Sequence, residues 1–171
     1  SGLRAQIGAV QTQEAQSYQA SSYVPDLEPT RPGIEGRFEV FHRLDDERRF
    51  EFASGFHESV SHVADSSVPS RVFSVDWFAN PWRKLEFTGV YYTGQNVANL
   101  GTGGIRQGVT VLGPGIARPV HNQGGWAQLT WITTPRLSFH LFAGRHDDRN
   151  SDLTAGRIGY AVADGRPIES P

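Results

Sequence analysis

The sequence of 171 residues contains no cysteine and no methionine. The lack of cysteine excludes disulfide bonds, thiolate metal sites and a cysteine nucleophile. The chain also lacks any run of about 18 consecutive apolar residues, the length that a membrane-spanning helix needs. Its formal net charge is -2, so no excess of basic residues favours nucleic acid as a partner. Without such a helix, any role in a membrane would have to use β-strands or a partner.

Glycine and proline are frequent, with 19 and 10 residues, and they favour turns and strands over helices. Apolar and polar side chains alternate with a period of two along much of the chain, which is typical of strands with two unlike faces. No segment keeps the spacing of an amphipathic helix. The alternation predicts a single all-β domain over residues 1–171, with about eight antiparallel strands in residues 3–10, 33–43, 49–57, 72–79, 84–93, 127–131, 137–143 and 157–163.

The predicted connections between these strands alternate in length. Tight connections, rich in Asp, Asn and Pro, lie at residues 44–48, 80–83 and 133–136. Longer segments lie between them, at residues 12–32, 60–70, 94–124 and 145–155, and we expect 12–32 and 94–124 to be long loops. Alternate connections of an antiparallel meander lie at the same end of the sheet. The order therefore predicts an up-and-down sheet with tight turns at one end and long loops at the other, as in a transmembrane barrel.

Two architectures fit this pattern: a β-barrel, whole or part of a larger one, and a soluble β-sandwich or jelly roll. In a membrane barrel the apolar face meets lipid and the polar face lines the lumen. In a sandwich the apolar faces pack together in a dry core. The side chains that distinguish the two architectures are Phe38, Phe50, Phe52, Phe87 and Leu141. They form an outward-facing band in the barrel and share one core in the sandwich.

Charged and aromatic residues provide the candidate site residues of the barrel. Charges of both signs share one face of the predicted strands, and we expect them to face the lumen: Glu35, Arg37, Glu39, Arg49, Glu51, Lys84 and Glu86. Aromatic residues lie near predicted strand ends, where they match the interfacial girdles of a membrane barrel: Trp77, Trp82, Tyr91, Tyr92, Trp126 and Trp131.

Between Arg31 and Tyr160 the sequence resembles a known group of proteins. The segments that carry the resemblance include Gly124-Gly125-Trp126, Thr134-Pro135-Arg136-Leu137, Ala143-Gly144 and the Asp/Asn/Arg-rich run from Asp147 to Asp152. They resemble uncharacterised, porin-like outer-membrane β-barrel proteins of Gram-negative bacteria. The resemblance implies an outer-membrane location, with the lipid bilayer or further barrel strands as partners. It also implies passive passage of small solutes or a structural role in the membrane.

The last residues depart from the pattern of that group. Residues 166–171 read Arg-Pro-Ile-Glu-Ser-Pro, whereas a complete bacterial barrel is expected to end in a strand with a terminal aromatic residue. Eight strands alone would also enclose an interior filled by side chains. We therefore expect the chain to be part of a longer barrel.

No catalytic motif emerges, and we expect neither an enzyme nor a cofactor. Asp148, Asn150 and Asp152 have the alternating oxygen spacing that opens a calcium loop, but the glycine and distal glutamate of an EF-hand are missing. A solvated loop is the better interpretation. His57 and His62 are one residue too far apart for the zinc-binding HExxH helix, and on a strand they face opposite ways.

Three glutamates could suggest the carboxylate pair of a glycoside hydrolase: Glu35, Glu39 and Glu51. Arg37 and Arg49 are close enough in sequence to neutralise them, which favours a salt-bridged face.

The alternative function is carbohydrate binding by a soluble β-sandwich. Tyr18, Tyr23 and Trp126 lie in or beside predicted loops, and their rings could stack on sugar faces. Such a protein would be secreted or periplasmic.

Overall fold

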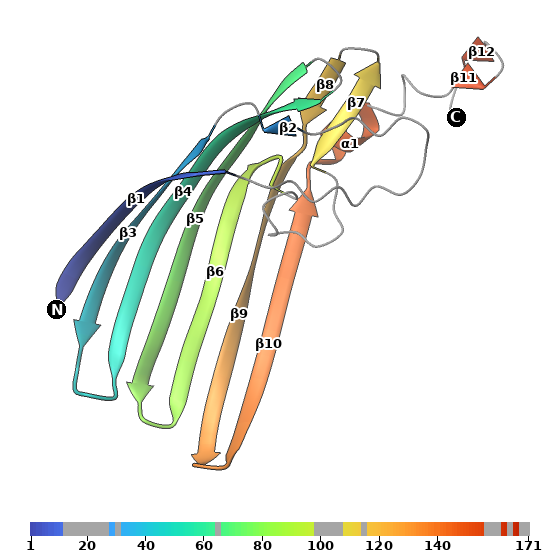
Figure 1. The fold of residues 1–171 in the computed structure, drawn as a ribbon. Coiled ribbons are helices and arrows are strands. Elements are labelled where there is room, and N and C mark those ends of the chain that lie inside the picture. Colours follow the sequence, from blue (N-terminus) through green and yellow to red (C-terminus); the bar gives the residue numbers. More distant parts are fainter. Residues whose placement is uncertain are drawn as a thin grey trace.

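The computed structural model describes residues 1–11, 28–29, 32–63, 66–97, 108–113, 116–155, 162–163 and 166–167. Their main element is one curved antiparallel sheet of seven long strands, shown in Figure 1. Chain order and spatial order agree along this sheet. In that order the strands are β1 (Gly2–Val10), β3 (Gly33–Arg43), β4 (Arg49–Val63), β5 (Ser66–Trp82), β6 (Leu85–Gln95), β9 (His121–Thr134) and β10 (Leu137–Asp148).

Shorter elements accompany the main sheet. β2 (Glu28–Pro29) pairs with β4, and β7 (Val109–Gly113) forms a two-stranded sheet with β8 (Ile116–Pro119). The helix α1 (Asn150–Ala155) follows β10. Figure 1 shows β2, β7, β8 and α1 gathered at the end of the sheet opposite to the tight turns. We call this the loop end, and the other the turn end.

The alternation of side chains predicted the main sheet correctly. Each of its seven strands covers or overlaps a predicted range, and the antiparallel pairing of successive strands confirms the all-β meander. The β3–β4, β5–β6 and β9–β10 turns lie together at the turn end in Figure 1, as expected. The sheet is not closed, since β1 and β10 are its two edges.

The predicted long connection at residues 60–70 is wrong. β4 continues to Val63 and β5 begins at Ser66, and the two strands remain paired up to these residues. Serine and histidine dominate this part of the hairpin, so large apolar side chains do not mark the alternation. The strands are continued by the backbone ladder, which does not depend on side-chain type. At residues 145–155, similarly, β10 extends to Asp148 and α1 follows.

Most of the predicted eighth strand, at residues 157–163, lies outside the described residues. Of this segment only β11 (Val162–Ala163) is described, and it pairs with β12 (Arg166–Pro167). Residues 157–161 lie outside the described residues. The predicted long loop 12–32 also lies outside them, apart from β2 and residue 32, whereas the predicted loop 94–124 contains β7, β8 and the first residues of β9.

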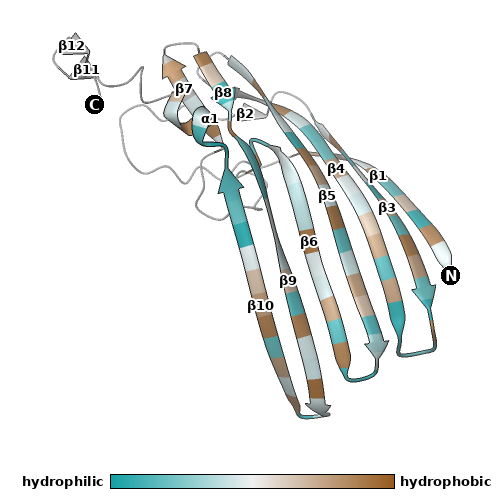
Figure 2. Ribbon diagram, turned by 180° about the vertical axis from the view of Figure 1, so that it is seen from behind, coloured by the Kyte–Doolittle hydropathy of each residue, from teal (hydrophilic) through white to brown (hydrophobic). Residues whose placement is uncertain are grey.

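The main sheet has one mainly apolar face and one mainly polar face, and the residues of each cross-strand pair lie on the same face. The apolar face includes the chain Val40–Phe52–Trp77, and the polar face includes the neighbouring chain Glu39–Ala53–Asp76. Figure 2 shows the resulting alternation of brown and teal along the strands. Exposure is the reverse of that in a soluble sheet, because Phe52 is 55% exposed whereas Glu39 is 4% exposed.

A small apolar core lies at the loop end. Val68, Val97 and Val120 are fully buried there. Asn96, which has a φ of 52°, donates its backbone N–H to the Val120 carbonyl and its side-chain amide to the Ser70 hydroxyl. Asparagine is one of the few residues with a side chain that adopts this left-handed conformation readily. This core holds residues 96–97, after β6, and residue 120, before β9, against β5.

Aromatic rings lie over glycines at several cross-strand pairs. The directly opposed pairs are Gly2 with Phe41, Gly36 with Phe56, Gly89 with Trp77 and Gly124 with Tyr92. In each pair a Cβ on the glycine would lie within 3 Å of the aromatic side chain. The missing Cβ leaves the space that the ring occupies, so these pairs fix the register of neighbouring strands.

The pair at Gly89 leads to a test of this packing. We expect Gly89→Ala to lower the free energy of unfolding by about 1–3 kcal/mol. A Cβ there would lie 2.4 Å from Trp77 Cζ2 and 2.6 Å from the carbonyl oxygen of Trp126, and the backbone cannot move aside cheaply. Gly8→Ala is the control, since nothing lies within 4 Å of its Cβ position. Equilibrium urea unfolding measures both; equal losses would contradict the packing argument.

Candidate functional site

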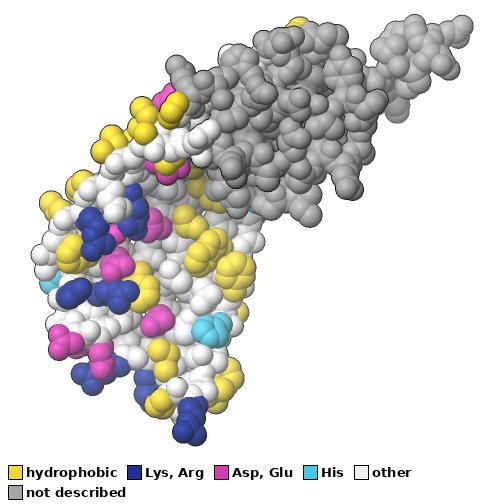
Figure 3. All heavy atoms as spheres, in the orientation of Figure 1, with side chains coloured by type: hydrophobic (Ala, Val, Ile, Leu, Met, Phe, Trp, Pro, Cys, Tyr) yellow, Lys and Arg dark blue, Asp and Glu magenta, His cyan; other side chains and the backbone are white. Residues whose placement is uncertain are grey.

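The candidate functional site is the polar face of the main sheet. Figure 3 shows basic and acidic side chains intermingled over the half formed by β1, β3, β4 and β5. At its centre the Glu39 carboxylate accepts hydrogen bonds from Arg4, at 3.0 Å, and from Arg37. Arg37 also donates to Asp76 at 2.7 Å. The four side chains form one ion-paired chain across three successive strand pairs, with the most buried charge in the middle.

Two further pairs extend this network. Arg49 donates to Glu51 at 2.7 Å, and its guanidinium lies 4.4 Å from the ring centroid of Phe78. The His57 ring contacts Glu35 at 2.7 Å and Ser59 at 2.8 Å. The predicted salt-bridged face is therefore confirmed. A carboxylate pair for glycoside hydrolysis is not assembled among these residues, because each glutamate has a cationic or histidine partner.

Most of the residues predicted to face a lumen lie together on the polar face. They are Glu35, Arg37, Glu39, Arg49, Glu51 and Glu86. Lys84 does not belong with them, because it lies in the two-residue turn before β6 and its Nζ approaches the Thr133 carbonyl at 3.5 Å. Side chains alternate between the two faces only within a strand. The alternation along β6 therefore does not assign Lys84, in the turn, to either face.

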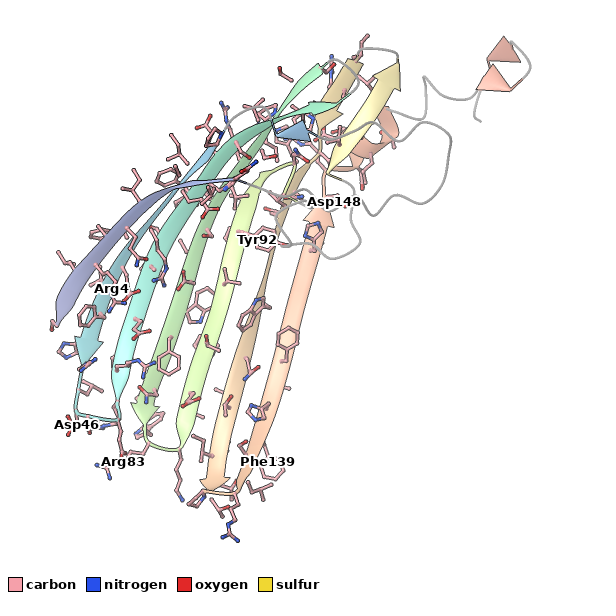
Figure 4. All side chains as sticks on the ribbon, in the orientation of Figure 1. Arg4, Asp46, Arg83, Tyr92, Phe139 and Asp148 are labelled. Carbon is pink, nitrogen blue, oxygen red and sulfur yellow. The ribbon has the colours of Figure 1, made fainter. Side chains whose placement is uncertain are left out.

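A second polar cluster lies on the same face near the loop end, on β6, β9 and β10. Tyr92 Oη lies 2.5 Å from His146 Nδ1, and His146 Nε2 lies 2.7 Å from Asp148 Oδ1. Figure 4 labels Tyr92 and Asp148 at that end of the sheet. With His146 neutral and protonated on Nε2, Tyr92 donates to the ring and the ring donates to Asp148. The imidazole of His146 thus joins the Tyr92 phenol to the Asp148 carboxylate by two hydrogen bonds.

Asn122 lies directly opposite Asp148 in the β9–β10 ladder. Its side chain is 5% exposed, and neither its amide nitrogen nor its oxygen has a hydrogen-bond partner in the part of the chain that the structure describes. Sequence reasoning missed the whole cluster. The i, i+2 spacing of His146 and Asp148 was visible, but only the register brings Tyr92 and Asn122 beside them.

The predicted aromatic girdle is divided between the two faces. Trp77, Trp82, Tyr91 and Trp131 lie on the apolar face, where Trp82 pairs with Leu85 and Trp131 with Phe139 at the turn end. Tyr92 and Trp126 were wrongly grouped with them. Neighbours along a strand point to opposite faces, so Tyr91 and Tyr92 cannot share a girdle. Trp126 lies on the polar face, with its ring 5.8 Å from that of Phe142.

The calcium-like spacing at residues 148–152 does not form a site. Asp148 contacts His146, whereas Asp152 accepts from the backbone N–H of His121 at 3.0 Å and contacts its ring at 2.8 Å. Burial alone would raise the pKa of Asp152, but these His121 contacts outweigh it and hold the pKa below its usual value. Asn150 begins α1. Among the described residues, no three His, Cys, Asp or Glu side chains are placed to hold a metal ion.

His57 contacts Glu35 at 2.7 Å, and the side chain of His62 lies outside the described residues. Within the described ranges, no helix has the length and apolar character needed to cross a membrane.

No protein-family model, curated protein or solved structure matches the chain.

Proposed function

We propose that this chain forms part of the wall of an outer-membrane β-barrel, with its apolar face toward lipid and its polar face toward a water-accessible interior. The observation that carries the proposal is the reversed exposure of the two faces. The large side chains that separate the two architectures are open to the surroundings: Phe38, Phe50, Phe52, Phe87 and Leu141. In a sandwich these side chains would be the core.

The apolar band on β4 ends at an ion pair. On β4 the band runs from Phe50 to Phe56, which spans about 20 Å at about 3.3 Å per residue. The next outward position is Glu58, which pairs with Arg71. Apolar bands of outer-membrane barrels are about 25 Å tall, and bacterial outer membranes are thinner than average bilayers. Strands of such barrels tilt by about 35–45°, so these residues of β4 would rise by about 15 Å and cover part of that layer.

The polar face favours a narrow interior, or one filled by side chains, and argues against an open pore. The charges of its central network are mutually paired, and Glu39 is almost inaccessible. Such a network resembles the packed interiors of small barrels. A structural role in the membrane therefore fits the chain by itself, and passage of small solutes fits it as one section of a larger wall.

The direction of the edge strands sets a condition on closure. Six antiparallel pairs separate β1 from β10, so the two edges run in the same direction. Direct pairing between them would be parallel. Antiparallel closure requires one further strand, or another odd number, between the edges. In the proposed barrel those strands complete the wall and remove the unpaired edges, which cannot face hydrocarbon.

The alternative is a soluble, carbohydrate-binding β-sandwich, which needs a second sheet over the apolar face. The two smaller sheets of the described residues have two strands each. Neither offers enough strands to cover seven. The exposed band therefore favours lipid over a sugar-binding sandwich.

Tryptophan fluorescence tests the proposed orientation. The chain contains four tryptophans, so variants that keep Trp131 or Trp126 alone, with the others changed to Phe, report on opposite faces. In vesicles of phospholipid brominated near the headgroup end of the acyl chains, we expect quenching of Trp131 to be several-fold greater than that of Trp126. Unbrominated vesicles are the control. Equal quenching of the two, or none, would reject the orientation.

A further inference from the structure

A groove runs over the outer side of β6, β9 and β10, on the apolar face. Its volume is about 580 Å³, within the range of ligand sites. Small residues form its floor, including Gly125, Ala127 and Ala143, and Trp77 and Tyr91 form a wall. The groove exists because the large side chains of the band are replaced here by glycine and alanine.

A second, polar cavity of about 550 Å³ adjoins this groove toward the loop end. The two cavities share Gln123 and Asp147 in their linings. At the junction the Tyr91 hydroxyl donates to Gln123 at 3.1 Å. Arg71 and Arg149 line the polar cavity, and Arg145 lines the groove close to the junction. The result is one amphipathic depression that passes from apolar to charged along the strands.

We propose that this depression binds one phospholipid molecule, with an acyl chain in the groove and a zwitterionic phosphate-and-amine headgroup in the polar cavity. The inference rests on the proposed membrane orientation, because it requires the apolar face to meet lipid. It adds a specific site to that general contact.

The charges around the polar cavity match such a headgroup. Arg145 contacts Asp147 only at 3.5 Å, and Arg71 pairs with Glu58 at an exposed position. Exposed ion pairs contribute little, so these guanidinium groups can turn toward a phosphate at small cost. Arginine binds phosphate oxygens in a bidentate manner. The Asp147 carboxylate can pair with the ammonium group of a zwitterionic headgroup. An anionic headgroup without an amine would offer it no such partner.

Native mass spectrometry of the whole chain, released from detergent micelles, tests the site. The probe is dipalmitoyl phosphatidylethanolamine, and we expect one molecule to be retained. Ala143→Phe fills the groove and should reduce retention at least tenfold. Leu141→Phe is the matched control, because it lies on the same strand and face but does not line the groove, and it should leave retention unchanged.

Probes that lack one half of the lipid test the two cavities separately. Dipalmitoylglycerol lacks the phosphate and phosphoethanolamine lacks the chains, so each should be retained at least tenfold less than the complete lipid. Unchanged retention by Ala143→Phe, or retention of dipalmitoylglycerol equal to that of the phospholipid, would overturn the site. Quenching of Trp131 separates this failure from failure of the proposed orientation, because Trp131 does not line the groove, whereas Trp126 does.

Discussion

Leu141→Arg should cost the chain about 2–4 kcal/mol of unfolding free energy in a phospholipid bilayer. Leu141 lies in the middle of β10, where it is 71% exposed on the apolar face. A guanidinium at that depth must leave water for hydrocarbon. In a soluble sheet the same substitution would change stability by about 0.5 kcal/mol or less, since the side chain already meets water. Equilibrium urea unfolding in phospholipid vesicles measures the difference.

His140→Arg is the matched control for this substitution. His140 is the preceding residue, at almost the same depth but on the polar face, where it contacts Thr130 at 3.0 Å. Because that face is proposed to meet water, His140→Arg should cost much less than Leu141→Arg. Similar losses at both positions would argue against a bilayer on one side. Tolerance of Leu141→Arg in vesicles would reject lipid contact at β10.

The second large effect is expected at the centre of the ion-paired chain. Glu39→Gln should lower the free energy of unfolding by about 2 kcal/mol, between the costs of breaking an exposed and a buried ion pair, because Glu39 is buried and its arginine partners are partly exposed. The neutral amide cannot balance the two guanidinium groups, of Arg4 and Arg37, that the carboxylate now separates. Equilibrium urea unfolding, followed by tryptophan fluorescence, provides the measurement.

Glu51→Gln provides the comparison, because Glu51 has one cationic partner, Arg49, at a more exposed position. Its loss should be about 1 kcal/mol or less. Adding Arg4→Gln to Glu39→Gln should recover part of the stability, since it removes one of the two unbalanced charges. If Glu39→Gln and Glu51→Gln are equally mild, the network is not held together at Glu39.

The paired charges also change how ion selectivity should be tested. Alternation places Arg37 and Glu51 on one face without showing which charges are paired. The structure pairs Arg37 with Glu39 and Asp76, and Glu51 with Arg49. A charge reversal that keeps pairs intact should therefore exchange Arg49 with Glu51, because Arg37 has two acidic partners.

Period-two alternation predicted the main sheet because each strand has two unlike faces, and this signal is local. For example, β4 can be predicted from Phe50, Phe52 and Phe56 alone, without knowledge of any other strand. The same reasoning stopped at residue 57, because hydrogen bonds to β5 continue where large apolar residues end. Strand ends that depend only on the backbone ladder are thus poorly visible in a sequence.

The candidate site was only partly predictable because it depends on register. Alternation placed Arg37 and Glu39 on one face, but it could not bring Arg4 or Asp76 to them. These contacts join residues from separate strands, as does the contact between Tyr92 and His146. Alternation also places adjacent residues of a strand on opposite faces of the sheet. The girdle prediction overlooked this rule at Tyr91 and Tyr92.

The glycine and aromatic pairs have a consequence for the history of the sequence. At Gly36 and Phe56, as at Gly89 and Trp77, a side chain on one strand occupies the space left by its neighbour. A larger residue at the glycine is tolerated only after the ring has been lost, and loss of the ring first exposes bare backbone. Relatives of this chain should therefore keep or exchange both members together, so such covarying positions would reveal the strand register from sequences alone.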